Sequence, residues 1–361
     1  MKIAFDYQIF YLQKFGGISK YYYNLALNLI ENNPETKIFA PIFKNFYGKD
    51  LAKKNILKGK YISDYPRFTS KLINKLNFHL SDFYLKKFNP DIFHITYFNQ
   101  AYRNKLNTKN ILTVYDLIHE KYSHYYDYSY PKKKALEYAD HIICISENTK
   151  SDLLKYYNVD EKKISTIYLG VDNNHFGINK IKRNKKYILY VGERSKYKNF
   201  KNFIVAFSKS KMLLENFDII CFGGGQFNSN EIKYFKDLKI PENSIFYFSG
   251  DDQYLKSFYL GAEFLIIPSF YEGFGLPLIE AMSFNCPVLC SKTSSLEEIS
   301  GDAAIFFDPN KYEDMKVTME NFIIKTDKED IIKKGRINSL KYTWKKCTNE
   351  TLKIYKNIAN I

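Results

Sequence analysis

The stretch Pro268-Ser-Phe-Tyr-Glu272-Gly-Phe-Gly-Leu-Pro-Leu-Ile-Glu280-Ala-Met decides how this chain is interpreted. It follows an apolar run, residues 263–267, which is short, rich in β-branched residues and ended by a proline, as expected of a buried parallel strand. After the glycines comes Pro277, which suits the first turn of a helix because its missing N–H is not needed there. The sequence therefore predicts a strand, a glycine loop and a helix in succession.

A loop of this kind lies at the carboxyl ends of the strands in an open α/β sheet, where ligands bind. Gly273 and Gly275 allow the backbone to approach a ligand closely, and the free N–H groups of the new helix favour an anion. Glu272 lies on the loop and Glu280 is expected in the first helical turn, where a carboxylate accepts hydrogen bonds from donors such as sugar hydroxyls. Taken singly, a glutamate in a first turn more often compensates the helix dipole at the surface.

The whole motif, Pro-Ser-x-Tyr-Glu-Gly-Phe-Gly-Leu-Pro-x-x-Glu-Ala-Met, resembles that of the retaining glycosyltransferases of family 4, which have the GT-B fold. The resemblance covers nearly the whole chain and is strongest over residues 187–309. It implies an α/β protein with two Rossmann-like domains that face each other across a cleft. We expect an acceptor-binding domain over 1–172, a linker over 173–186, a domain that binds the nucleotide-sugar donor over 187–344, and a C-terminal helix over 345–361 that crosses back to the first domain.

The composition is that of a globular protein with a strongly basic balance. The chain has 361 residues, of which 45% are hydrophobic, and its formal net charge is +15. This is long enough for two domains and apolar enough for a sizeable core without disulfides. Most of the basic excess lies in residues 1–180, where it suits an anionic membrane surface, a phosphate-bearing acceptor, nucleic acid, or simply a solvated surface.

Five cysteines are scattered along the chain without a Cys-x-x-Cys pair. Such usage suits a reducing compartment and gives no zinc pattern. The chain begins directly with a strand pattern, Lys2–Phe5, and no apolar run approaches about 18 residues. We therefore expect a cytoplasmic protein with no signal peptide and no membrane-spanning segment.

Candidate site residues in the first half follow strand patterns. The pair Gly16-Gly17 precedes a helix and offers backbone N–H groups to a phosphate, although a glycine pair is often a plain turn. The resemblance implies that these glycines abut the donor diphosphate. Asp116 and His119 follow the strand over 111–115 and are candidates to contact the donor sugar or the acceptor. Many family members have a histidine where this chain has Tyr115, so a catalytic histidine is not carried over.

In the second half, Val191-Gly192-Glu-Arg194-Ser-Lys196-Tyr-Lys198 is a strand end, a glycine and a basic loop. Arginine and lysine there suit a diphosphate, though such a loop is equally often just solvated. The resemblance implies that Arg194 and Lys198 contact the donor phosphates, with Lys196 in reserve. It further implies that Glu280 holds the ribose hydroxyls and that Glu272 contacts the donor sugar, helped by the amides of Phe274, Gly275 and Leu276.

The segment 44–89 is basic and aromatic, with an amphipathic helix over about 70–88. The resemblance implies that this half often contacts membranes through basic and apolar surface, so we consider peripheral contact with an anionic membrane at the inner face. The apolar face of this helix is equally compatible with ordinary core.

The resemblance implies transfer of a sugar from a nucleotide diphosphate to a saccharide or lipid-linked acceptor, with anomeric retention. No Asp-x-Asp metal motif stands at a suitable strand end, so we expect no metal and no other cofactor. Similarity to envelope-polysaccharide mannosyltransferases favours GDP-mannose weakly over a UDP-type donor and suggests lipopolysaccharide or related polysaccharide synthesis. The alternatives are a nucleotide-sugar epimerase or phosphorylase on the same scaffold, a nucleic-acid-binding protein, and an inactive scaffold.

Overall fold

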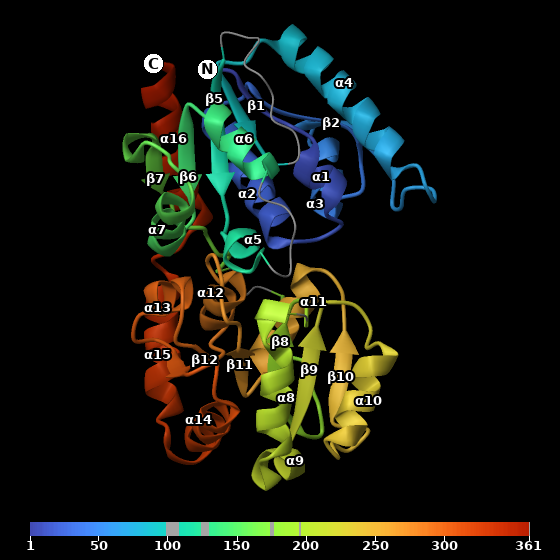
Figure 1. Cartoon of the computed structure of the whole chain (residues 1–361), viewed down its shortest axis with the longest axis vertical. Helices are drawn as coiled ribbons and strands as arrows, with labels where there is room; N and C mark the ends of the chain where they lie inside the picture. The colour runs from blue at the N-terminus through green and yellow to red at the C-terminus, as the bar shows by residue number, and fades with distance from the viewer. Residues whose placement is uncertain (99–107, 124–129, 174–176, 195, 361) are drawn as a thin grey trace. The chain divides into compact units, whose positions relative to one another are not determined.

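The computed structural model describes residues 1–98, 108–123, 130–173, 177–194 and 196–360 (Figure 1). The chain divides into two compact units: Met1–Gly170 with Trp344–Ile361 form the first, and Val171–Thr343 form the second. The expected linker over 173–186 falls in the second unit, and its residues 174–176 lie outside the described residues, as does Ile361 at the end of the expected C-terminal helix.

The first unit is built on a parallel sheet whose strand order is β3-β2-β1-β4-β5-β6-β7. Its strands are β1 (Ile3–Phe5), β2 (Thr36–Phe43), β3 (Leu57–Tyr61), β4 (Ile92–Ile95), β5 (Lys109–Val114), β6 (His141–Cys144) and β7 (Ile164–Thr166). Its helices are α1 (Gln8–Leu12), α2 (Gly17–Asn32), α3 (Phe46–Lys53), α4 (Ser70–Phe88), α5 (Ile118–Lys121), α6 (Tyr130–Tyr138), α7 (Glu147–Tyr156) and α16 (Trp344–Ala359). The sequence did not predict β3, because its residues Leu-Lys-Gly-Lys-Tyr lack an apolar pattern.

The second unit is a parallel sheet in the order β10-β9-β8-β11-β12-β13. Its strands are β8 (Lys186–Val191), β9 (Phe217–Phe222), β10 (Ile245–Phe248), β11 (Phe264–Ile267), β12 (Val288–Ser291) and β13 (Ile305–Phe307). Its helices are α8 (Phe200–Ser208), α9 (Lys211–Asn216), α10 (Ser229–Asp237), α11 (Asp252–Gly261), α12 (Leu276–Ser283), α13 (Ser295–Ser300), α14 (Tyr312–Lys325) and α15 (Lys328–Ser339). The expected strand, glycine loop and helix around Glu272 are confirmed as β11 and α12. Both units are Rossmann-like, as expected.

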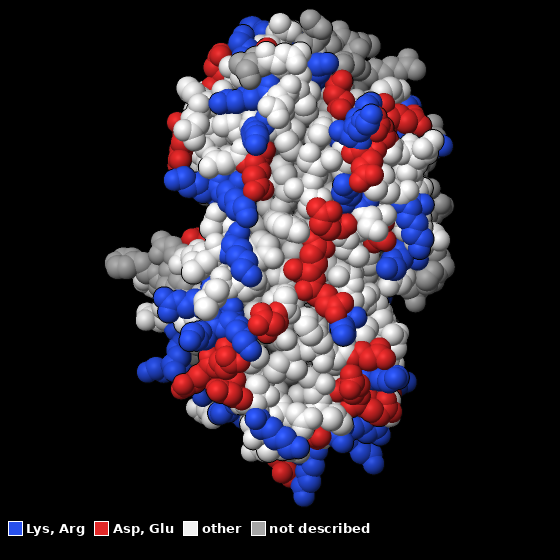
Figure 2. All heavy atoms as spheres, turned by 90° about the vertical axis from the view of Figure 1, so that its left-hand side faces the viewer, with Lys and Arg blue, Asp and Glu red and all other residues white. Residues whose placement is uncertain are grey.

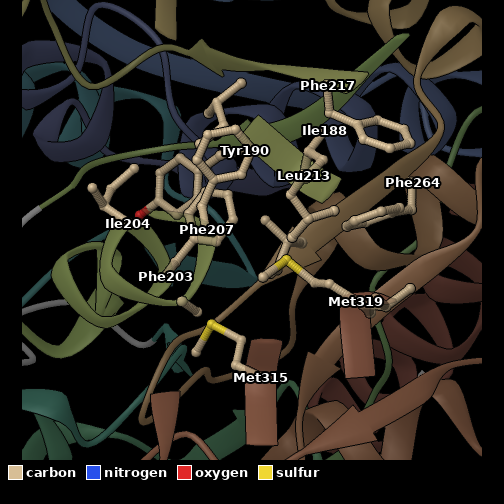
Figure 3. Close-up of a cluster of buried hydrophobic side chains, with 14 of the residues drawn as sticks. Ile188, Tyr190, Phe203, Ile204, Phe207, Leu213, Phe217, Phe264, Met315 and Met319 are labelled. Atoms are coloured by element: carbon tan, nitrogen blue, oxygen red, sulfur yellow. The ribbon is translucent and has the colours of Figure 1, made fainter. Parts of the chain in front are cut away.

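A cluster of buried apolar side chains fills one face of the second sheet (Figure 3). Phe203 and Phe207 of α8 lie with Ile188 of β8 and with Met315 and Met319 of α14, and all of them are fully buried. Burying a side chain of this size stabilises the folded state by about 1.5–3 kcal/mol relative to leaving it exposed. Helices α11 and α12 contact β8, β11 and β12, so the sheet is covered by helices on both faces.

The C-terminal helix α16 belongs to the first unit and packs on α2 there, so the expected return of the chain to the first domain is confirmed. A buried histidine joins this helix to the sheet: His94 Nδ1 lies 2.5 Å from the Tyr355 hydroxyl of α16, and Nε2 lies 2.8 Å from Thr113 Oγ1. Because both ring nitrogens have partners, the buried imidazole is satisfied without a charge. Burial lowers the pKa of His94 to about 3.

A second buried titratable group, the carboxyl of Asp6, lies at the end of β1. Asp6 accepts hydrogen bonds from the Thr96 amide at 3.0 Å, from the Thr96 hydroxyl and from the Gln8 side-chain amide at 2.6 Å. Burial raises the pKa of Asp6 to about 6, although these hydrogen bonds oppose the rise. The carboxyl ends of β1 and β4, which are neighbours in the sheet, are thus occupied by buried polar side chains that bond to one another.

Helix α4 (Figure 1) exposes Leu72, Leu76 and Leu80 and buries Ile73 and Leu85. Its buried face also carries Asn77 and Ser81, and Asn77 bonds to both the N–H and the C=O of Ile42, at 2.7 and 2.8 Å. These backbone groups follow Pro41, where the pairing of β2 with β3 shifts register between Phe39 and Ile42. The buried face of α4 thus combines two apolar residues with the polar residues that the strand backbone requires, and a row of leucines on the helix stays exposed.

Charges of both signs are interspersed over the face of the molecule drawn in Figure 2. Lys and Arg side chains lie close to Asp and Glu over much of this view, so this face offers no broad surface of a single sign. Among the described residues, no helix combines the length and the apolar character needed to cross a membrane.

The buried pair of titratable groups gives a prediction about stability and pH. As pH falls below about 6.5, the unfolded chain takes up a proton at His94 that the folded chain refuses, so this group lowers the free energy of unfolding by about 1.4 kcal/mol per pH unit down to about pH 3. Asp6 has the opposite sign: its folded pKa is raised, so stability is gained as pH falls through about 6.

We therefore expect the two contributions to offset each other in the wild type between about pH 6 and 4. In His94→Gln, only the contribution of Asp6 remains. The free energy of unfolding of the variant, relative to that of the wild type, should therefore rise by about 2 kcal/mol as the pH falls from 6 to 4.5. Chemical unfolding of both proteins at a series of pH values measures this. A difference between them that does not change with pH would contradict the prediction.

Candidate functional site

A pocket opens in the second unit at the carboxyl ends of β8 and β11. These neighbouring strands are the point where the chain order reverses, since β9 and β10 lie on one side of them and β12 and β13 on the other. Ligands of open α/β sheets bind at this position because the loops on either side diverge. The lining includes Tyr190, Lys198, Ser269, Glu272 and Gly275.

The loop after β8 is tied to the loop after β11 by bonds on both sides of Lys198. The Tyr197 carbonyl accepts from the Phe270 amide at 2.8 Å. The buried Asn199 side-chain amide donates to the carbonyls of Pro268 and Pro309, at 2.9 and 2.8 Å. Lys198 is therefore held opposite the glycine loop by its own neighbours in sequence.

The loop after β12 holds Glu272 by its backbone. The Glu272 amide donates to Ser294 Oγ at 2.9 Å, and the Ser295 hydroxyl donates to the Glu272 carbonyl at 2.8 Å. Ser294 has a φ of 50° and a ψ of −141°, a conformation that non-glycine residues rarely adopt. Backbone strain of this kind persists only where surrounding contacts enforce it, and it concentrates at functional sites.

The side chain of Glu272 carries the main charge contact of the pocket. Its Oε1 lies 2.7 Å from Lys198 Nζ and also accepts from the Ser269 hydroxyl at 2.7 Å. The two charged side chains are only 21% and 14% exposed, and Ser269 is buried. Lys198 and Glu272, which the sequence predicted for this site, are thus brought together, and Ser269 is a further member that the sequence analysis missed.

The start of α12 forms another part of the lining. Gly275 is the residue before the helix and has a φ of 88°, and a Cβ there would come within 2.9 Å of Leu296 Cδ2. The positive φ favours glycine at this position, and a larger residue would also have to displace the tip of the Leu296 side chain. Leu276 is the first helical residue and Pro277 lies in the first turn, as predicted. The predicted residue Phe274 is buried and packs edge-on against Tyr342.

Glu280 lies one turn further along than expected. The helix begins at Leu276, so Glu280 is not in the first turn, which contains no acidic residue. Its side chain is almost fully buried, and its Oε2 accepts a hydrogen bond from the Tyr259 hydroxyl at 3.1 Å. Burial, and then the charge of Glu280, raise the pKa of Tyr259, so the phenol stays protonated and donates. Sequence reasoning gave no signal for Tyr259.

Arg194 is bonded to a neighbouring turn and is not among the lining residues of the pocket. Its guanidinium donates to Glu231 Oε1 at 2.7 Å and to the carbonyls of Gly223, Gly225 and Gln226 at 2.9–3.2 Å. The glycine turn after β9 is therefore wrapped around this one side chain. Burial raises the pKa of Glu231, but hydrogen bonds from Arg194 and Asn228 outweigh it and hold that pKa below its usual value.

The candidates from the first half of the chain lie in the first unit. Gly16 is the residue before α2, and Gly17 is its first residue. Asp116 follows β5, where it accepts from the Ile118 amide at 3.1 Å, and His119 lies on the short helix α5. Tyr115 is buried and donates to the Tyr22 hydroxyl at 2.7 Å, so it belongs to the interior of this unit.

The part of the chain that the structure describes contains no group of three or more His, Cys, Asp or Glu residues arranged to hold a metal ion. The charged groups that line the pocket are a lysine and a glutamate. An anion is the ligand that best suits a lysine beside a helix start.

Two family models match the chain and together span most of it. "Glycosyl transferases group 1" matches residues 171–338, and "Glycosyltransferase Family 4" matches residues 15–175. The first of these regions contains the pocket and all of the second unit's candidate residues.

Curated relatives and a solved structure point the same way. The chain is 26% identical over 236 residues to the O-antigen chain mannosyltransferase B of Escherichia coli, covering 62% of each chain. It is 30% identical over 190 residues to the O-antigen chain mannosyltransferase RfbU of Salmonella typhimurium, covering 52% of each. The matches therefore span only about half to three fifths of these relatives. Anabaena Alr3699/HepE, solved in complex with UDP and glucose, shares the fold with a TM-score of 0.75 at 14% identity, over 99% of this chain and 100% of that one.

The bonding of Arg194 predicts a structural cost for its removal. Arg194→Ala leaves the buried side of Glu231 and several turn carbonyls without their donor, so we expect the free energy of unfolding to fall by about 2–4 kcal/mol. Arg194→Lys should recover only part of the lost stability, because an ammonium cannot reproduce the planar arrangement of N–H donors of a guanidinium. Chemical denaturation measures the effect. The exposed Arg336→Ala is the control and should change stability by less than about 0.5 kcal/mol; equal effects of Arg194→Ala and Arg336→Ala would refute the assignment.

Proposed function

The chain belongs to the family 4 glycosyltransferases, and from this premise we propose that it transfers a sugar from a nucleotide-diphosphate donor to a saccharide or lipid-linked acceptor, with retention of anomeric configuration. One observation carries the proposal: the pocket at the carboxyl ends of β8 and β11 combines a lysine, the start of a helix and a glutamate. Cationic and amide donors suit a diphosphate, and a carboxylate suits sugar hydroxyls.

The leaving diphosphate gains negative charge as the glycosidic bond to the donor breaks. We propose that Lys198 and the start of α12 stabilise this charge electrostatically and that no metal ion is needed. The amides of Phe274, Gly275 and Leu276 are proposed to help Glu272 at the donor sugar. Arg194 adds positive charge at the same end of the sheet, and it holds the glycine turn after β9. Glu272 contacts the donor sugar.

Glu280 is proposed to bind the ribose hydroxyls of the donor. Its carboxylate is held by Tyr259 and is otherwise shielded from water, so a hydroxyl pair that reaches it would find a strong acceptor. From the resemblance we further propose that Gly16 and Gly17 contact the donor diphosphate. Asp116 and His119 are proposed to contact the donor sugar or the acceptor.

The relatives supply the proposed biological setting. Two of them are named as mannosyltransferases of O-antigen chains, which favours a mannosyl donor such as GDP-mannose and a role in the synthesis of lipopolysaccharide or another cell-surface polysaccharide. The structural neighbour was solved with UDP and glucose, so UDP-sugars are the second donor class to test.

Contact with a membrane is proposed for the outer face of α4. Leu72, Leu76, Leu80 and Phe83 are 41–60% exposed along it. Exposed basic residues flank them: Arg67, Lys71, Lys75, Lys86 and Lys87. An apolar ridge bordered by positive charge suits the interface of an anionic bilayer, where a lipid-linked acceptor would reside.

A transfer assay tests the central proposal. We expect sugar transfer from GDP-mannose or a UDP-sugar to a lipid-linked or soluble saccharide, with a retained anomeric centre, and full activity in EDTA. Nuclear magnetic resonance of the product reports the anomer. Conversion of the donor without an acceptor would indicate an epimerase instead, release of a sugar phosphate a phosphorylase, and a strict metal requirement would contradict the role given to Lys198.

Removal of the buried carboxylate tests the donor site. Glu280→Ala should weaken binding of the preferred nucleoside diphosphate by roughly 10- to 100-fold, because the ribose hydroxyls lose a charged acceptor. Isothermal titration calorimetry measures it. Glu297→Ala, on the exposed side of α13, is the matched control and should bind like the wild type. Unchanged binding by Glu280→Ala would show that this residue does not contact the nucleotide.

Vesicle sedimentation tests the role of α4. We expect binding to vesicles of phosphatidylglycerol and phosphatidylethanolamine but little to phosphatidylcholine alone, and at least a roughly tenfold loss in the triple variant Leu72→Ser, Leu76→Ser, Leu80→Ser. The control replaces Ile337 and Leu340, which are 55% and 60% exposed in the second unit, by serine. Equal losses of vesicle binding in both variants, or no vesicle binding by the wild type, would contradict the proposed membrane contact of α4.

A further inference from the structure

The groups proposed to bind two different parts of the donor are bonded to each other in the structure. Lys198 is assigned to the diphosphate and Glu272 to the sugar, yet Nζ of the one lies 2.7 Å from Oε1 of the other. Resting on the proposed function, we infer that the donor diphosphate takes Lys198 away from Glu272, and that the Ser269 hydroxyl keeps the released carboxylate in place for the sugar. Ser269 is thus a positioning residue, which acts through Glu272.

The hydrogen-bond pattern supports this exchange. Ser269 and Lys198 donate to the same carboxylate oxygen, each at 2.7 Å. When the lysine leaves, that oxygen keeps one donor and the carboxylate keeps its direction. Ser269 is 2% exposed, so its hydroxyl has little room to turn elsewhere.

Only side chains need to move in this step. The backbone around Lys198 is fixed by the Tyr197 carbonyl and the Asn199 side chain, and the backbone of Glu272 is fixed by Ser294 and Ser295. The lysine stem has four rotatable bonds and the ammonium has three donors, of which the described residues occupy one. Its ammonium can therefore swing from the carboxylate to a phosphate oxygen without disturbing the loops.

Electrostatics gives the exchange a measurable consequence. A carboxylate beside the phosphate site repels a bound anion, and more strongly in a partly buried pocket than in water. A nucleoside diphosphate must compete with Glu272 for Lys198 and gains nothing from the freed carboxylate. A nucleotide sugar also competes with Glu272 for Lys198, but its sugar hydroxyls donate hydrogen bonds to Glu272 in place of the lysine. The pair therefore discriminates the intact donor from the nucleoside diphosphate product, which favours product release.

Calorimetric titration with UDP against UDP-glucose, and with GDP against GDP-mannose, tests the exchange. Glu272→Gln keeps the shape of the side chain but removes its charge, so we expect it to bind the nucleoside diphosphate roughly fivefold tighter and the nucleotide sugar more weakly than the wild type. Lys198→Ala should weaken both ligands.

Ser269 is tested by the same titrations and by kinetics. Ser269→Ala should leave binding of the nucleoside diphosphate within about twofold, while binding of the nucleotide sugar and kcat fall roughly tenfold. Ser269→Thr keeps the hydroxyl and should restore both. Ser208→Ala removes a hydroxyl on α8 that bonds only to a carbonyl of its own helix, Val205, and serves as the control. Melting temperatures of all variants show whether they fold.

The outcomes separate the exchange from the function on which it rests. If the wild type binds no nucleoside diphosphate or nucleotide sugar, the proposed function itself is wrong and the exchange falls with it. If the wild type binds these ligands but Glu272→Gln weakens the nucleoside diphosphate, Glu272 does not compete for Lys198 and the exchange alone is overturned. A Ser269→Ala variant that loses both ligands equally, or is not rescued by threonine, would overturn the role of Ser269.

Discussion

The hydrogen bonds that tie three loops together at the carboxyl end of the second sheet are what the site depends on. Asn199 reaches from the loop after β8 to the carbonyls of Pro268 and Pro309, and Ser294 and Ser295 hold the amide and the carbonyl of Glu272. Each bond joins a side chain to a backbone group, so the loops are fixed by groups that cannot move away independently. These bonds hold the loops that carry Lys198 and Glu272 in a fixed position at the carboxyl end of the sheet.

The two units share a topology but use the same position differently. In both, the strand order reverses beside the first strand of the unit, between β1 and β4 in the first and between β8 and β11 in the second. In the first unit, Asp6, Gln8 and Thr96 fill this place and bond to one another. In the second, small residues and a helix start leave it open.

The orientation of α4 illustrates how backbone demands act together with hydrophobic pattern. Pro41 interrupts the pairing of β2 with β3, and the freed groups of Ile42 need partners. Asn77 supplies both bonds, so its face of the helix must turn inward. The leucines on the other side are then exposed, at a cost that a bilayer would offset. The same orientation buries Ile73 and Leu85, so it combines apolar burial with the two backbone bonds.

The sequence by itself determined the fold class and the centre of the site. A buried strand, a glycine loop and a helix with an early proline are local patterns, so Lys198, Glu272 and Gly275 could be placed at a strand end before any coordinates were known. The positive φ of Gly275 is likewise a local requirement that only glycine meets easily.

Only the tertiary structure decided the partners of those residues. Tyr259 gave no signal, and Ser269 appeared in the motif without a role, because a hydroxyl that donates to a carboxylate has no periodic pattern. Arg194 lies in the basic loop that suggested phosphate binding, yet its donors meet the turn after β9, about thirty residues away in the chain. The amphipathic pattern of residues 70–88 likewise predicted a helix but not which face would be buried. Such choices depend on which groups meet in space, and that is set by long-range packing rather than by neighbours in the chain.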